Sequence, residues 1–158
     1  MRDITTKELG SFKTKIKNAL IKSDKINDLL KDGIDEPSNK IQQFKSHVKD
    51  HLFIDDTIKD TSTYIFFDVY MTELRPQIKK ISVVMYAITH RDILDNYAVE
   101  GYYGNRTDIL TQMIEEVLTD EKVKREFGIG DLTIDNIDIY NSNSFYGRIL
   151  SFSVSNFR

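Results

Sequence analysis

Two neighbouring segments of the chain alternate like strands and are apolar or aromatic on both faces. In the first, residues 61–71, the two faces are Ile65, Phe67, Val69 and Met71 against Tyr64, Phe66, Asp68 and Tyr70. In the second, residues 77–89, they are Ile81, Val83, Met85 and Ala87 against Val84, Tyr86 and Ile88. Period-two alternation of β-branched and aromatic side chains predicts strands. The short break between the segments predicts an antiparallel hairpin.

The first 60 residues follow a helical period instead. Apolar residues at helical spacing predict an amphipathic helix over residues 5–22. Ser23 or Asp24 is expected to cap a shorter second helix, which Gly33 would end. Residues 40–52 are either a third helix or a partly ordered segment. Residues 1–60 are therefore predicted to form a helical N-terminal region.

The C-terminal part adds one helix and two further strands. A single apolar stripe predicts a helix over residues 106–118, with Thr107 as its cap. Residues 132–140 and 148–157 are predicted strands, and the alternation of the first slips near Asp135, which suggests a bulge. The expected fold is α+β: one domain, with residues 61–158 forming a four-stranded, mainly antiparallel sheet and helices packed on one face.

The second face of this sheet is the first functional clue. Antiparallel sheets in small domains usually keep one face in water. If the helices cover one face, the aromatic stripe on the other needs a cover of its own; it consists of Tyr64, Phe66, Tyr70 and Tyr86. The cover is either the N-terminal region folding round or a neighbouring subunit. These residues are the candidate subunit interface.

A second candidate surface is the loop at residues 101–105. Tyr102 and Tyr103 stand between Gly101 and Gly104, so two aromatic side chains occupy a segment with glycine at each end. Such a loop is expected to dock on a neighbouring ring of protein. The alternative, of equal weight, is that it folds back on its own core.

The sequence contains few groups arranged for catalysis. His90-Arg91-Asp92 matches a kinase catalytic loop, but the other kinase motifs are missing, so a polar loop is expected. His47 and His51 would share one face of a helix, as in zinc proteases, but no glutamate follows the first histidine. The chain has no cysteine. We predict no enzyme activity, no cofactor and no bound metal.

Charge and hydropathy exclude two classes of partner. The formal net charge is −3 at pH 7, whereas nucleic-acid-binding domains are normally basic. No apolar run approaches the roughly 20 residues of a membrane-spanning helix, and the N-terminus MRDITTKELG lacks a signal-peptide core. We therefore expect no specific nucleic-acid binding and no membrane contact.

The order of segments from about residue 45 to 158 resembles that of bacteriophage tail terminator (tail completion) proteins. The resemblance lies in His51-Leu52-Phe53-Ile54, the aromatic strand 64–70, the helix beginning Arg106-Thr107-Asp108, the Gly-Ile-Gly turn and the terminal strand from Tyr146. The helical N-terminal extension departs from that pattern.

The resemblance implies a structural virion protein of the long-tailed phage neck, assembled in the bacterial host cytoplasm. Such proteins form a ring, typically a homohexamer, that ends the tail tube and faces the head–tail connector or head-closure protein. Genomic DNA passes through the channel. The alternatives are another neck protein, such as a head-closure ring, or a tail tube subunit. A small metal-dependent hydrolase built on His47 and His51 is the remote alternative.

Overall fold

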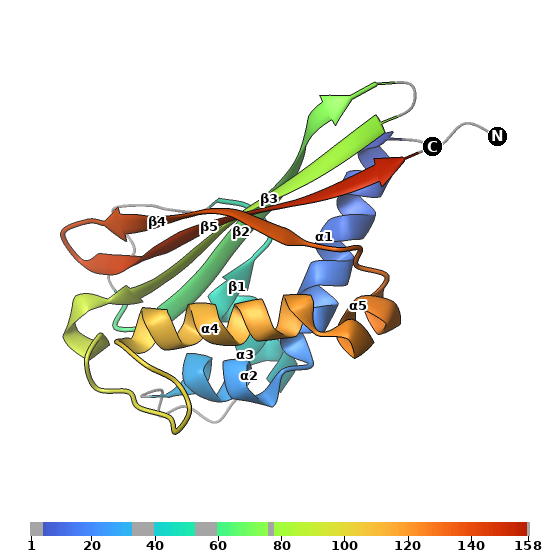
Figure 1. Cartoon of the computed structure of the whole chain (residues 1–158). Helices are drawn as coiled ribbons and strands as arrows, with labels where there is room; N and C mark the ends of the chain where they lie inside the picture. The colour runs from blue at the N-terminus through green and yellow to red at the C-terminus, as the bar shows by residue number, and fades with distance from the viewer. Residues whose placement is uncertain (1–4, 33–39, 53–59, 76–77, 158) are drawn as a thin grey trace.

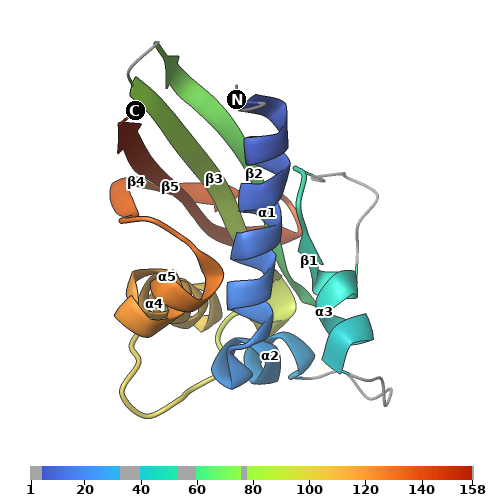
Figure 2. The ribbon, with the colours of Figure 1, turned by 90° about the vertical axis from the view of Figure 1, so that its right-hand side faces the viewer.

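The chain folds as one layer of helices against one face of a five-stranded sheet (Figures 1 and 2). The computed structural model describes residues 5–32, 40–52, 60–75 and 78–157. Helices and strands occupy separate layers, which confirms the expected α+β class.

The sheet has the strand order β1-β2-β3-β5-β4. Its long strands are β2 (Thr63–Leu74), β3 (Ile78–His90), β5 (Phe145–Phe157) and β4 (Thr133–Asn141), and all pair antiparallel. The β2–β3 hairpin is confirmed. So is the slip in β4, where the register shifts between Ile134 and Asn136.

The prediction of four strands is wrong by one short strand. β1 (Val48–Lys49) pairs parallel to β2, with Val48 opposite Ile65, so the sheet is mixed. Two residues directly after a helix show no strand period, and only their pairing with β2 makes them a strand.

Three helices come from the N-terminal region: α1 (Thr5–Ile21), α2 (Asp24–Lys31) and α3 (Lys40–His47). Ser23 caps α2 as expected, its hydroxyl accepting from the N–H of Ile26 at 3.3 Å. The expected stop at Gly33 lies outside the described residues.

The C-terminal helices are α4 (Arg106–Thr119) and the short α5 (Glu121–Phe127), which the sequence did not predict. Asp120 separates them, and its carboxylate caps α5 through the N–H groups of Lys122 and Val123. The cap of α4 is Asn105, not Thr107. His90 ends β3, and a 3₁₀ turn, η1 (Arg91–Ile93), follows as a polar loop.

The main core lies between the helices and the near face of the sheet. Its strand residues are Ile65, Phe67, Val69, Ile81, Val83, Met85, Ala87, Leu150, Phe152 and Val154. Its helix residues include Phe12, Ile16, Leu20, Leu29, Leu110, Met113 and Ile114. The far face carries a second, smaller buried cluster of Tyr64, Phe66, Ile88 and Phe145. Both faces of the sheet thus bury apolar side chains within a single chain.

None of the helices that the structure describes is long and apolar enough to cross a membrane.

Candidate functional site

The loop before α4 holds one aromatic side chain out in solvent. Tyr103 is 78% exposed, the largest exposed fraction among the exposed large hydrophobic residues of the described chain. Gly101 and Gly104, on either side of the tyrosine pair, have φ values of +91° and +100°. Left-handed backbone of this kind favours glycine, which explains why glycine stands at both positions.

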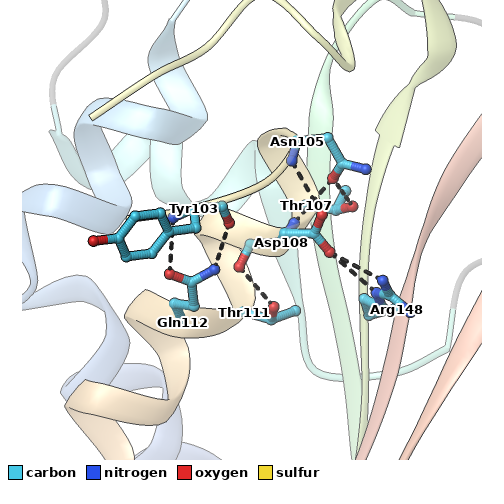
Figure 3. Close-up of polar contacts among 7 residues, drawn as sticks. All are labelled: Tyr103, Asn105, Thr107, Asp108, Thr111, Gln112 and Arg148. Carbon is cyan, nitrogen blue, oxygen red and sulfur yellow. Dashed lines mark hydrogen bonds and ion pairs between the residues drawn. The ribbon is translucent and has the colours of Figure 1, made fainter. Parts of the chain in front are cut away.

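The backbone of Tyr103 is clamped by a side chain of α4 (Figure 3). The Tyr103 N–H donates to Gln112 Oε1 at 3.2 Å, and Gln112 Nε2 donates to the Tyr103 carbonyl at 2.6 Å. Both hydrogen-bonding groups of one amide side chain therefore hold the two polar backbone groups of one residue. The exposed ring projects from a fixed backbone.

The loop joins α4 through a capping box. The Asn105 side chain accepts from the N–H of Asp108 at 3.0 Å, and the Asp108 carboxylate accepts from the N–H of Asn105 at 3.0 Å. The second carboxylate oxygen of Asp108 accepts from Nε and Nη2 of Arg148 on β5, both at 3.2 Å (Figure 3). A Cβ on Gly104 would lie 2.5 Å from Asp108 Oδ2, so this position has no room for a side chain. Loop, helix and sheet are tied together at Asp108.

Arg106 is buried and holds the segment of residues 93–97, which precedes the loop. No motif in the sequence predicted this role. Its side chain is 1% exposed, its Nε donates to the Ile93 carbonyl at 2.9 Å, and its Nη2 donates to Asp32 at 2.8 Å. The guanidinium carbon lies 4.8 Å from the ring centroid of Tyr97. No sequence pattern marks Arg106 as buried, because its partners come from two separate segments, residues 93–97 and Asp32 after α2.

The two loop tyrosines have different environments. Tyr102 is half-buried: its hydroxyl donates to Glu116 at 2.9 Å and accepts from Lys25 Nζ at 3.0 Å. The hydrogen bond between Lys25 and Tyr102 is the main reason why the pKa of Lys25 is raised. Tyr102 thus folds back on its own chain, and Tyr103 alone is displayed.

The aromatic stripe on the far face is divided in the same way. Tyr64 and Phe66 are 8% and 1% exposed in the single chain, and Tyr64 stacks on His47 of α3 with ring centroids 5.4 Å apart. Tyr86 is half-buried and meets Tyr140 edge-on. Tyr70 is 45% exposed. Of the two covers expected for this stripe, the N-terminal region supplies part at Tyr64 through His47, while Tyr70 stays open. The use of the stripe as a subunit interface stays a prediction.

The two histidines do not share a helix face. Helix α3 ends at His47, while His51 follows β1. His47 is 6% exposed, and its Nδ1–H donates to the Thr63 carbonyl at 2.8 Å. Burial lowers the pKa of His47. The His51 side chain is 57% exposed, with its Nδ1 3.5 Å from Asp50. Within the described ranges, no three His, Asp or Glu residues are grouped so as to hold a metal ion.

His90 also has a structural role here. Its Nδ1 accepts from the N–H of Asp92 at 3.1 Å, which caps the 3₁₀ turn. Arg91 Nε donates to the Ser142 carbonyl at 3.0 Å and so ties this turn to the β4–β5 hairpin. This arrangement is the polar loop that the sequence predicted.

Comparison with known proteins identifies a family for the chain. No curated protein matches the chain. A family model described as YomW matches residues 14–154, a span that includes α2 to α5, strands β1 to β4, most of β5 and both candidate surfaces. The chain therefore belongs to the YomW family and is a phage-related protein.

Proposed function

We propose that this protein is a structural component of a phage particle: a ring that ends the tail tube and joins it to the head connector, leaving a channel for DNA. Membership of a phage-related family supports a role in a phage particle. The resemblance of residues 45–158 to tail terminator proteins supports the ring. The observation that carries the docking role is Tyr103, an exposed aromatic residue on a backbone fixed by Gln112.

A preorganised aromatic side chain is well suited to anchor a protein interface. Tyrosine is enriched among residues that dominate binding energy, because it buries a large area with few rotatable bonds. The clamp on Tyr103 also means that little loop entropy is lost on binding. A partner that covers this ring gains apolar contact and does not have to order the loop.

A ring between two other rings needs lateral and axial contacts, and the chain offers surfaces in two directions. Figure 1 shows the loop between η1 and α4 on the helix side of the molecule, away from the far face of the sheet that carries Tyr70. We assign the loop to an axial partner, the tail tube or the head connector, and the far face to a neighbouring subunit. The net charge of −3 suits a channel wall that does not grip DNA phosphates.

The decisive test combines localisation and mutation. In particles carrying labelled protein, electron microscopy should find the label at the head-proximal end of the tail. Tyr103→Ala should leave the purified protein folded and reduce its incorporation into particles at least tenfold, whereas Tyr103→Phe should incorporate normally. Normal incorporation of Tyr103→Ala would contradict the docking role.

The same labelled particles separate this proposal from its nearest alternatives. A head-closure ring would place the label on the head side of the junction, and a tail tube subunit would place it along the whole tail. Light scattering of the protein mixed with purified tails completes the test. If the protein stays monomeric in that mixture, the proposal that it forms a ring is wrong.

A further inference from the structure

Among the described residues, the sheet ends on each side in a strand that is not fully paired. On each of these edges an aspartate accepts a hydrogen bond from a backbone N–H that points outward. β4 is the edge strand on one side. On the other side, β1 covers β2 only at Ile65 and Phe66, so among the described residues the rest of β2 has no strand outside it. Open edges present unpaired N–H and C=O groups to any other strand.

The hydrogen-bond pattern shows which groups of β4 point outward. The Ser142 N–H donates to the Phe145 carbonyl at 2.9 Å, so Asn141 and Tyr146 form a pair that does not exchange hydrogen bonds. Bonding alternates along the uninterrupted register from Asn141 to Asn136. The backbone groups of Ile139 and Ile137 therefore point away from β5.

Asp138 occupies one of these outward groups. The Ile139 N–H donates to the carboxylate of Asp138, its own neighbour, at 2.8 Å. The side chains of Ile137 and Ile139 are 55% and 54% exposed, so this edge also offers apolar surface to an incoming strand. A strand that pairs here must displace a charged acceptor from the Ile139 N–H.

β2 repeats the arrangement on the opposite edge. The His90 N–H donates to the Ser62 carbonyl at 3.0 Å, which by the same alternation directs the backbone groups of Val69 outward. The Val69 N–H donates to the Asp68 carboxylate at 2.8 Å. Asp68 is also held 2.8 Å from Lys13 of α1.

We infer that Asp138 and Asp68 keep the two open edges of the sheet from pairing with the edge of a second copy of this chain. Each carboxylate accepts the hydrogen bond of the outward N–H, and Asp138 also places a negative charge beside its strand, whereas the charge of Asp68 is paired with Lys13. A second copy is the relevant partner because its β2 edge and β4 edge would continue the same sheet. Head-to-tail pairing of this kind gives a ring where the rotation between copies closes and an open chain of subunits where it does not. The inference does not rest on the proposed function.

The test removes the Asp138 carboxylate from the β4 edge and includes a matched control on the same strand. Asp138→Ala should self-associate at an about tenfold lower protein concentration than the wild type, because pairing no longer displaces a charge-assisted hydrogen bond. Asp138→Asn, which retains an acceptor, should fall between the two. Asp135→Ala makes the same charge change on β4, at the register shift, and should behave as the wild type. Sedimentation velocity over a concentration series measures all four proteins.

A second substitution shows whether the association uses the backbone edge. Because the Ile139 N–H points away from β5, proline at this position removes no hydrogen bond of the sheet but blocks a new one. Asp138→Ala combined with Ile139→Pro should return to wild-type association. Asp138→Ala that associates no more than the wild type overturns the inference. Association that persists with Ile139→Pro also overturns it, as does equal association of Asp135→Ala.

Discussion

Asp108 of α4 accepts two hydrogen bonds from Arg148 of β5 while its other oxygen accepts from the backbone N–H of Asn105. One carboxylate therefore joins the helix layer to the sheet and closes the loop that displays Tyr103. The position of the exposed ring depends on a contact between residues that are 40 positions apart in the sequence.

Asp108→Ala should lower the free energy of unfolding by about 2 kcal/mol, because it removes half of the capping box and the ion pair together. Asp108→Asn keeps an acceptor for the Asn105 N–H and should lose about half as much. Urea denaturation measures both. Glu115→Ala, at an exposed position of the same helix, is the control and should stay within about 0.5 kcal/mol of the wild type. An equally stable Asp108→Ala protein would show that this junction is not structural.

Gly147→Ala should destabilise the sheet strongly. A Cβ on Gly147 would lie 2.0 Å from the carbonyl oxygen of Ala87 on β3, and two strand backbones cannot separate cheaply, so we expect a loss of about 3 kcal/mol or more. Gly10→Ala in α1 is the matched control. Nothing lies within 4 Å of its new methyl group, and removing glycine from a helix should raise stability by about 0.5–1 kcal/mol. Thermal unfolding should therefore shift in opposite directions for the two variants.

Protonation of His47 should destabilise the fold. Burial lowers the pKa of His47 below its ordinary value of 6.5, so the unfolded chain binds this proton more readily than the folded chain. The free energy of unfolding that depends on a neutral His47 is fully present above pH 6.5 and decreases as the pH falls below that value. The free energy of unfolding, measured in urea from pH 8 to pH 5, should decrease less in His47→Gln than in the wild type. His51 and His90 remain in both proteins, so identical slopes would contradict the prediction.

Phe66 and Tyr70 lie on the same face of β2, but their truncation should affect different properties of the protein. Phe66→Ala should cost about 3–5 kcal/mol of stability, because the ring is 1% exposed. Tyr70→Ala should cost less than about 1 kcal/mol, because its ring is 45% exposed, but should weaken subunit association. Denaturation and sedimentation of both variants test this division. A Tyr70→Ala protein with unchanged association would remove Tyr70 from the interface.

The sequence by itself determined the classes and most positions of the long elements. Alternation in residues 61–71 and 77–89 and the apolar stripe of 106–118 are local patterns, and burial of one side requires the matching period. β1 and α5 escaped this reasoning because neither is long enough to show a period.

Only the tertiary structure decided which patterned residues are exposed and which are covered. Tyr102 and Tyr103 are adjacent and identical in type, yet Glu116 and Lys25 hold one and solvent surrounds the other. The outward direction of the Ile139 N–H depends on its register with Arg148, and the burial of Arg106 depends on Asp32. These properties arise from pairs of residues distant along the chain, and no local pattern encodes which distant residue arrives.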